Sequence, residues 1–287
     1  MPGLTQDETA ELFLAACRAE INALKPGNVH IHAGGHGMEV AQFEASAAAA
    51  APWIAAPELN VGARILRGME ASLAIAGCNT NLGILLLAAP LAAAAQAEET
   101  GSLRARLSRV LARLNAGDAL DVYAAIRTAN PGGLGTASSQ DVSAPPTIGL
   151  SDAMALAANR DRIARAYVTD FAEIFEFGLP TLERARQAAA NSELMVTTLH
   201  MAYFAEQPDS HIARKFGSAI AEQVRKEALR HKHLWHPAVE PSSFAELLAF
   251  DADLKRRNLN PGTTADFVVG TLFAASIRDR LHLSSSP

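Results

Sequence analysis

The sequence has little of what marks secreted or membrane proteins. Its 287 residues include only 2 cysteines, and aromatic residues make up 6% of the chain. Cys17 and Cys78 are too few for a disulfide framework and fit a reducing compartment. The most apolar run, Leu82 to Ala95, is interrupted by Pro90 and is shorter than the ~20 residues that span a bilayer. We therefore expect a cytoplasmic protein without a membrane-spanning segment.

Several sequence signatures are also missing. The residues from Met1 to Glu11 lack the basic start of a secretory signal peptide. No G-x-x-x-x-G-K-[ST] motif occurs, which excludes a Walker-type phosphate loop. No G-x-G-x-x-G motif opens a strand–helix unit, and no G-x-S-x-G nucleophile elbow is present.

The charge balance excludes one class of partner. The formal net charge is −5 and the sequence pI is about 6.0. A dedicated nucleic-acid-binding domain would usually be basic, so we expect no nucleic-acid partner. A small anionic ligand is compatible with this charge, because local Lys, Arg and backbone N–H groups can bind phosphate inside an acidic protein.

What the sequence does have is alanine in helical patterns. Hydrophobic residues make up 49% of the chain, and alanine dominates them. Alanine has the highest helix propensity, and its small side chain allows helices to pack closely. Clusters of β-branched residues are sparse, strict alternation is absent, and no repeat of fixed period occurs. We predict an all-α fold: one compact multi-helix domain over residues 1–287, with an Ala-rich core and apolar central helices.

Helix limits follow from apolar periodicity and from Pro and Gly breaks. The stretch from Leu82 to Ala97 is apolar on all faces and should be a central, surrounded helix. The segment Thr136 to Pro146 should be the longest loop, and the tail Ser284 to Pro287 should fray. The predicted helices run from Thr5 or Asp7 to about Ala23, and over Glu39–Ala55, Val61–Ala76, Leu82–Ala97, Leu103–Leu114, Leu120–Ala129, Ser151–Phe177, Pro180–Glu206, Pro208–His231, Ser243–Arg256 and Thr263–Leu281.

The polar residues of interest gather at five breaks between these helices. Core-facing helices are apolar, so polar function is expected where backbone groups are unpaired. The breaks are Lys25 to His30, Gly77 to Gly83, Pro131 to Gly135 with Asp141, Pro208 to Lys215, and Asn260 to Asp266.

Two of the breaks place small hydrogen-bonding residues just before a helix. Free N–H groups and the positive end of the helix dipole make such a position a potential anion site. The alternative is ordinary N-capping by Asn79 or Thr80 before one helix, and by Thr263 or Thr264 before the other. The sequence leaves both interpretations open.

Charged residues at the breaks also have two interpretations. Lys25, Arg214 and Lys215 could hold phosphate groups, or they could lie on solvated helix faces. Asp141, Asp161, Asp209 and Asp266 could ligate Mg²⁺, a hard ion that favours carboxylates and substrate phosphates. Asp209 and Asp266 also stand at helix starts, where a carboxylate is stabilising without any ligand.

A histidine-rich loop offers an alternative chemistry. In an extended segment His30 and His32 would point the same way, and with His36 they could ligate a transition metal for hydrolysis. However, histidines in loops usually form hydrogen bonds or are solvated. A metal-dependent hydrolase is therefore a second hypothesis, and a non-catalytic binding or scaffold protein is a third.

The motifs taken together resemble the signature blocks of the triphosphoribosyl-dephospho-CoA synthases. Any one block is weak, but the set keeps the family order over roughly Glu20 to Phe273. The blocks are Lys25-Pro26-Gly27, Gly77 with Asn79-Thr80 and Gly83, Gly132 to Gly135 with Asp141, Arg160-Asp161 with Ile163-Ala164, Asp209 with Arg214-Lys215, and Asn260 to Asp266.

The resemblance implies an all-α enzyme that releases adenine from ATP and transfers the triphosphoribosyl group to the 2′-hydroxyl of dephospho-CoA. One carboxylate would stabilise the cationic ribosyl centre and another would act as base. It implies Mg²⁺, with Asp209 and Asp266 as metal ligands, and a homodimer is possible. The implied catalytic residues are Asp141, Asp209 and Asp266. The implied substrate-binding residues are Lys25, Asn28, His36, Asn79, Thr80, Gly83, Arg214, Lys215, Asn260, Thr263 and Thr264.

The chain departs from the family pattern at several positions. His30 stands where an Asp follows the Lys-Pro-Gly motif, Gly37 stands where an Asp follows the loop histidine, and Leu82 stands where a Lys follows Asn-Thr-His. These changes resemble a branch found in methanogens and methylotrophs and associated with one-carbon carrier biosynthesis. Acting on a different phosphorylated precursor, of the methanopterin or methanofuran type, is therefore an alternative function.

Overall fold

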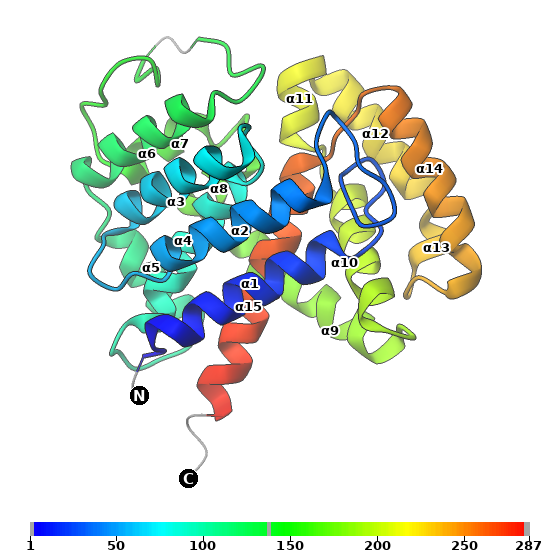
Figure 1. Ribbon diagram of the computed structural model, residues 1–287, viewed down its shortest axis with the longest axis horizontal. Helices are drawn as coiled ribbons and strands as arrows, with labels where there is room; N and C mark the ends of the chain where they lie inside the picture. Colours follow the sequence, from blue (N-terminus) through cyan, green and yellow to red (C-terminus); the bar gives the residue numbers. More distant parts are fainter. Residues whose placement is uncertain (1–2, 137–138, 284–287) are drawn as a thin grey trace. The chain divides into compact units, whose positions relative to one another are not determined.

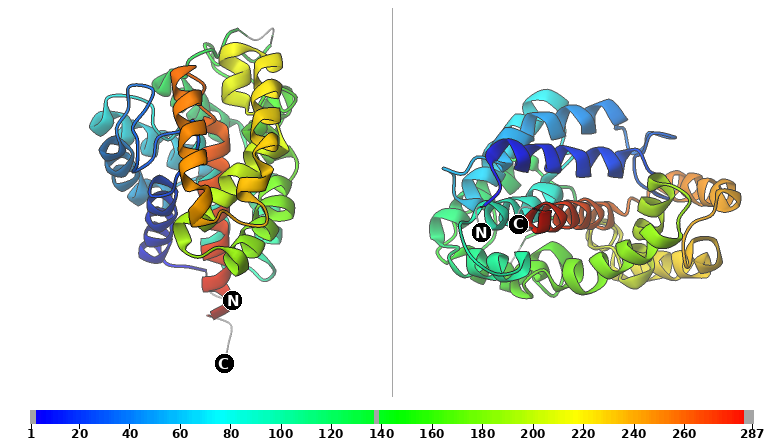
Figure 2. Two further views of the ribbon diagram at one scale, coloured as in Figure 1. Left: turned by 90° about the vertical axis from the view of Figure 1, so that its right-hand side faces the viewer. Right: turned by 90° about the horizontal axis from the view of Figure 1, so that it is seen from below.

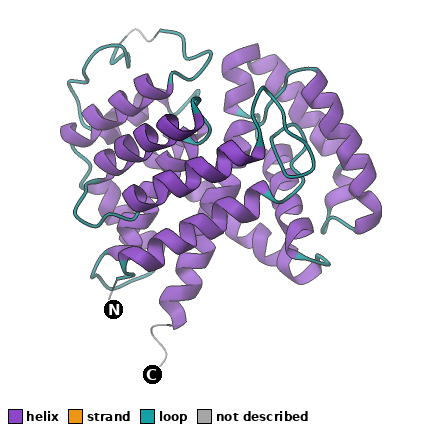
Figure 3. Cartoon of the chain, in the orientation of Figure 1, coloured by secondary structure: helices purple, strands orange, loops and turns teal. Residues whose placement is uncertain are grey.

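The structure is a computed structural model that describes residues 3–136 and 139–283. Within these ranges the regular secondary structure is helical, and only two isolated β-bridges occur, His30 with Ala33 and Gly35 with Met38 (Figure 3). The all-α prediction is confirmed. The predicted fraying of residues 284–287, and residues 137–138 of the predicted long loop, lie outside the described residues.

Most helix limits agree closely with the sequence prediction, and Figure 2 shows the last and longest helix as one continuous red coil. No described helix is long and apolar enough to cross a membrane. The helices are α1 (Gln6–Ile21), α2 (Val40–Ile54), α3 (Val61–Ala76), α4 (Leu82–Gln96), α5 (Leu103–Ala112), α6 (Ala116–Ala129), α7 (Leu150–Ala157), α8 (Arg162–Val168), a π-helix (Glu173–Gly178), α9 (Leu179–Ala188), α10 (Ser192–Glu206), α11 (Ser210–Phe216), α12 (Ser218–Arg230), α13 (Lys232–Trp235), a 3-10 helix (Pro241–Ser243), α14 (Phe244–Arg256) and α15 (Gly262–Leu283).

Three long predicted helices were wrong, because each is divided by a polar or glycine residue. Asp161 accepts hydrogen bonds from two backbone N–H groups and starts α8, so the segment predicted as Ser151–Phe177 is broken. Asn191 caps α10 in the same way, and Gly217, at φ +92°, separates α11 from α12. Ser243 was predicted to cap the helix over α14 but forms no side-chain cap bond.

The chain folds into two compact units, each assembled from segments that are distant in sequence. Unit 1 comprises Met1–Ala16, Ala45–Ala172 and Phe273–Pro287, and unit 2 comprises Cys17–Glu44 and Glu173–Leu272. The single-domain organisation over residues 1–287 stays a prediction.

Unit 1 is built around α4, whose residues are buried on nearly all sides, as its apolar sequence predicted. Beside it, α3 packs along α6 (Figure 1). Gly62 allows this close approach, because a Cβ atom there would lie 2.6 Å from the Asp118 Cα atom. The Asp118 carboxylate also accepts the Gly62 N–H at 2.9 Å, which joins the start of α3 to α6.

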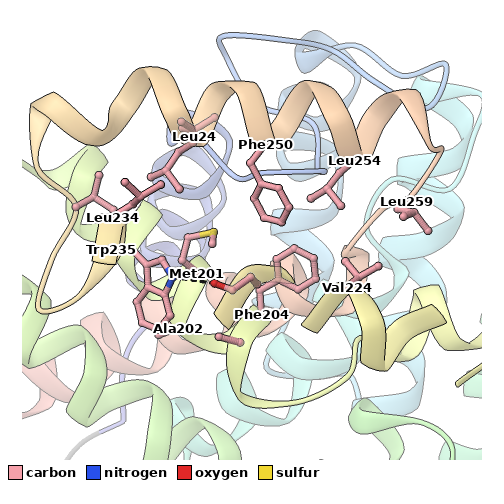
Figure 4. Packing of buried hydrophobic residues seen from close by; sticks show 14 of the residues in the cluster. Leu24, Met201, Ala202, Phe204, Val224, Leu234, Trp235, Phe250, Leu254 and Leu259 are labelled. Carbon is pink, nitrogen blue, oxygen red and sulfur yellow. Dashed lines mark hydrogen bonds between the residues drawn. The ribbon is translucent and has the colours of Figure 1, made fainter. Parts of the chain in front are cut away.

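Unit 2 has its own apolar cluster, contributed largely by α10, α12 and α14 (Figure 4). Phe204 and Phe250 stack in it with ring centroids 6.4 Å apart. Leu24 and Leu259 belong to the same cluster and directly precede Lys25 and Asn260. Burial of each such side chain contributes about 1.5–3 kcal/mol. The core therefore anchors the chain where two of the polar breaks begin.

Candidate ligand-binding site

Three of the five polar breaks meet within unit 2. The Asn28 Nδ2 atom donates to Asn260 Oδ1 at 2.8 Å, which joins the first break to the last. The Thr264 hydroxyl donates to Asp209 Oδ2 at 2.8 Å, which joins the last break to the fourth. Gly27, at φ +87°, lies against Pro261, where a Cβ atom would be 2.8 Å from the proline Cδ. Segments more than 200 residues apart in sequence thus form one polar cluster.

Lys25 is the buried centre of this cluster. It is 0% exposed, forms an ion pair with Glu20, and donates to Asn28 Oδ1 at 3.1 Å. Burial lowers the pKa of Lys25 and raises the pKa of Glu20, and the attraction between the two charges opposes both shifts. Lys25, which was predicted to contact phosphate directly, is therefore engaged inside the protein, where it supports the loop.

Asp209 joins two helix starts. Its Oδ1 atom accepts the backbone N–H groups of His211 and Ile212 at the start of α11. Its Oδ2 atom accepts the N–H and the hydroxyl of Thr264 at the start of α15. A carboxylate has about four acceptor positions, so these four bonds occupy them. A metal ion bound to Asp209 would therefore compete with these helix caps, and the metal-ligand role of Asp209 stays a prediction.

The other residues at the start of α15 have different surroundings. Thr263 is buried, and its hydroxyl oxygen accepts a bond from the Ser210 hydroxyl at 3.0 Å. Asp266 is half-buried just after the first turn of α15, and its negative charge acts to raise the pKa of Lys25. No group of three or more His, Cys, Asp or Glu residues in the described ranges could hold a metal ion.

A cationic face lies beside the start of α15. Arg214 is half-buried and Lys215 is exposed on α11, and the positive charges of both act on the buried ring of His211. The pKa of His211 is lowered to about 3, first by burial and then by Arg214, Lys215 and His36. The Nε2 atom of His211 is buried without a hydrogen-bond partner.

The loop histidines do not share a common centre. His36 contacts the Gly27 carbonyl oxygen at 2.8 Å through Nε2. His30 lies 3.3 Å from Asp251, and His32 lies 2.6 Å from Glu193. Each ring thus has its own protein partner, which gives the metal-hydrolase hypothesis no support.

The predicted residues of unit 1 have local bonding partners. Asn79 Oδ1 accepts the Leu82 N–H at 3.1 Å at the start of α4, and the Thr80 hydroxyl donates to Ser46 Oγ at 2.7 Å. Asp141 accepts the Ser143 N–H at 2.9 Å in a turn, and Gly83 lies in the first turn of α4. The N-cap residue of α4 is Asn81, which forms no side-chain cap bond, and Asn79 supplies a side-chain acceptor to this helix start from two residues earlier. The substrate and catalytic roles of these four residues stay predictions.

Sequence reasoning missed several buried polar residues of unit 2. Glu20, His200, Asp251 and the half-buried Lys255 lie within helices, so no break marks them, and only the i,i+4 acid–base spacing of Asp251 and Lys255 is visible in the sequence. The half-buried His211 lies in the break from Pro208 to Lys215, but its residue type gave no separate signal.

Buried neutral histidines predict a stability that depends on pH. Burial lowers the pKa of both His200 and His211 to about 3, so below pH 6.5 the unfolded chain binds protons that the folded chain does not. The free energy of unfolding should then fall as pH decreases from 6.5 toward 3, by up to about 1.4 kcal/mol per pH unit for each histidine.

Urea unfolding at pH 7.0 and pH 5.5 measures this dependence. A His200→Asn variant serves as the comparison, because it removes one of the two titrating groups. Its stability should depend less steeply on pH than that of the wild type. Equal slopes for the two proteins would show that His200 does not remain neutral in the fold.

Comparisons with known proteins agree with this architecture. A family model described as ATP:dephospho-CoA triphosphoribosyl transferase matches residues 6–285. Among solved structures, a protein from Archaeoglobus fulgidus described as a triphosphoribosyl-dephospho-CoA synthase is similar, with a TM-score of 0.61 and 23% identity over 80% of this chain and 96% of that chain. At this identity the structural likeness concerns the fold alone. No curated protein matches the chain significantly in sequence.

Proposed function

Because the chain belongs to the ATP:dephospho-CoA triphosphoribosyl transferase family, we propose that unit 2 holds the triphosphate of ATP at its cationic face. The enzyme transfers the triphosphoribosyl group of ATP to dephospho-CoA. The face consists of His36, Arg214, Lys215 and the first turn of α15. No observation favours the one-carbon carrier or metal-hydrolase alternatives.

One observation carries this assignment: Arg214 and Lys215 follow His211 on α11, and the ring of His211 lies against the start of α15. Gly262, at the start of α15, lies against that ring, since a Cβ atom there would be 3.1 Å from His211 Nδ1. Positive side chains beside a helix N-terminus form a favourable site for a polyphosphate. The Glu20–Lys25 ion pair and the helix caps formed by Asp209 hold the chain segments that carry this face.

The reaction sets the requirements for the remaining groups. The bond between C1′ of the ribose and adenine breaks, and adenine leaves with the electron pair and takes up a proton. A bond forms between C1′ and the 2′-hydroxyl oxygen of dephospho-CoA, whose own proton passes to a base. Positive charge develops at C1′, and a nearby carboxylate stabilises it. We assign that role to Asp266, which is half-buried just after the first turn of α15. The roles of Asp141 as base and of Asp209 in catalysis stay predictions.

Mg²⁺ belongs to the proposal as the ion that neutralises triphosphate charge when bound. The acceptor positions of Asp209 are occupied by helix caps, so Asp266 is the better-fitting of the two predicted ligands. A homodimer and a cytoplasmic location likewise stay predictions.

An adenine-release assay tests the proposal. Purified protein with ATP, Mg²⁺ and dephospho-CoA should free adenine, detected by chromatography. Arg214→Gln and Lys215→Gln should each raise the KM for ATP by about 10-fold, because a charge-assisted phosphate contact contributes about 1.5–3 kcal/mol. Lys226→Gln is the control, since that exposed residue of α12 is paired with Glu222.

Two outcomes would count against the assignment. Absence of adenine release from well-folded wild-type protein would refute the catalytic proposal. An unchanged KM for ATP in both Arg214→Gln and Lys215→Gln would show that the triphosphate does not bind at this face.

A further inference from the structure

The loop from Lys25 to Met38 has little regular structure of its own. It contains no helix or strand, and its internal hydrogen bonds are the two isolated bridges, the bonds between Lys25 and Asn28, and the contact of His36 with the Gly27 carbonyl oxygen. Gly27, His36 and Gly37 all have positive φ angles, of 87°, 57° and 73°. A glycine-rich segment has much conformational freedom to lose, so contacts from elsewhere help to keep it ordered. Helices α1 and α10 supply some of these contacts, and α14 supplies a buried charged pair.

Asp251 on α14 contributes the first of these contacts. Its Oδ1 atom accepts the backbone N–H of Gly27 at 2.8 Å. Its Oδ2 atom accepts from Lys255 Nζ at 2.9 Å and lies 3.3 Å from His30 Nε2. The residue is 2% exposed, so these bonds form away from water, where a charge-assisted hydrogen bond is strong.

Lys255, one turn further along α14, contributes the rest. Its ammonium group donates to Asp251 Oδ2, to the Ala33 carbonyl oxygen at 3.0 Å, and to His30 Nε2 at 3.2 Å. These contacts account for the three hydrogens of a lysine ammonium group. Gly35 lies over the Lys255 stem, where a Cβ atom would be 3.0 Å from Cε. The lysine therefore ties the middle of the loop to the helix.

The effect of this pair extends to the cationic face through a single residue, Gly27. Asp251 accepts the N–H of Gly27, and the contacts of Lys255 with His30 and Ala33 hold the residues that follow. The carbonyl oxygen of Gly27 in turn accepts a bond from His36 Nε2 at 2.8 Å. The orientation of His36 thus depends on a carboxylate that need not touch a ligand.

We infer that Asp251 and Lys255 are positioning residues that hold the Lys25–Met38 loop in the shape required for binding the ATP triphosphate. The inference rests on the proposed function for its ligand. The pair stands on the rigid helix α14, in the favourable order of acid before base at i,i+4. Support of this kind keeps contacting groups pre-organised, and its loss weakens binding without removing any contacting group.

Hydrogen exchange of the ligand-free protein, followed by mass spectrometry, tests the positioning itself. Asp251→Asn keeps the size of the side chain but removes the charge that Lys255 and His30 face. Peptides within residues 26–38 should exchange faster in this variant, with protection elsewhere unchanged. Asp253→Asn is the matched control, because Asp253 lies on the same helix and pairs with Arg256 and Arg257. Unchanged exchange in the loop of Asp251→Asn would overturn the inference, whatever the ligand.

Calorimetric titration with ATP and with dephospho-CoA tests the consequence for binding. Asp251→Asn and Lys255→Met should bind ATP about 10-fold or more weakly, since small misplacement of contacting groups has effects of this size. Affinity for dephospho-CoA should be unchanged, and Lys255→Arg should recover part of the loss. A merely structural defect would lower the folded fraction and leave both affinities of the folded protein unaltered.

The outcomes separate the two proposals. Wild-type protein that does not bind ATP would refute the proposed function, while the exchange result would still decide the positioning role. Wild-type protein that binds ATP, with equal affinity in folded Asp251→Asn and Lys255→Met, would refute the positioning role and leave the proposed function intact.

Discussion

Replacing Asp209 by Ala should reduce the free energy of unfolding by about 2–4 kcal/mol, because one carboxylate caps two helices and each cap contributes about 1–2 kcal/mol. The residue is 1% exposed, and removing it would leave N–H donors of both α11 and α15 without acceptors in a buried place. Urea unfolding followed by circular dichroism measures the change.

Asp161→Ala is the matched control for this prediction. Asp161 caps only α8, through the N–H groups of Ile163 and Ala164. Asp161→Ala should lower the free energy of unfolding by about 1 kcal/mol, as the loss of one ordinary cap does. If Asp209→Ala abolished adenine release while leaving the unfolding free energy unchanged, Asp209 would act in the chemistry rather than as the joint between two helices.

Replacing Lys25 by Met should destabilise the protein by about 3–5 kcal/mol, because breaking a buried ion pair leaves an uncompensated charge. The remaining charge is that of Glu20, which is 4% exposed. A double variant, Lys25→Met with Glu20→Leu, should recover most of the loss, since replacing both partners by apolar side chains is often neutral. Denaturant unfolding of the two single variants and the double variant completes the thermodynamic cycle.

The pH dependence of Lys25→Met provides a second check. Burial raises the pKa of Glu20, and without Lys25 nothing opposes that shift. A group with a raised pKa binds more protons in the folded state, so the stability deficit of the variant relative to the wild type should shrink as pH falls through that pKa. Additive losses in the cycle, or a deficit relative to the wild type that does not shrink on acidification, would show that Lys25 and Glu20 do not form the pair.

Helices were predictable here because their signals are local. Val61 to Ala76 was predicted at its observed limits, since Asn60 precedes it as a cap and Gly77 ends it in a left-handed conformation. The divisions at Asp161 and Asn191 were missed, because the apolar period continues across them and only the side-chain caps break it. Tertiary packing decides which polar residue interrupts a helix, and periodicity does not carry that information.

The site was predictable in part for a related reason. Breaks at Lys25, Asp209 and Asn260 stand out in sequence because Pro, Gly and small polar residues punctuate apolar helices, and the structure brings these three together. Whether a polar residue at a break contacts a ligand or the protein depends on its burial. Lys25 and Asp209 are buried, and both form hydrogen bonds within the protein. Asp251 and Lys255 lie on α14, and in the sequence their i,i+4 spacing is that of any acid–base pair on a helix surface. Only the structure shows that the Lys25–Met38 loop covers them.

Calorimetric titration with ATP, ADP and AMP tests most directly whether the cationic face of unit 2 holds the triphosphate. Affinity should fall with each phosphate removed, and in an Arg214→Gln, Lys215→Gln double variant the three nucleotides should bind almost equally. If AMP bound the wild type as tightly as ATP, or if the double variant kept the full preference for ATP, the triphosphate would not be held by these residues.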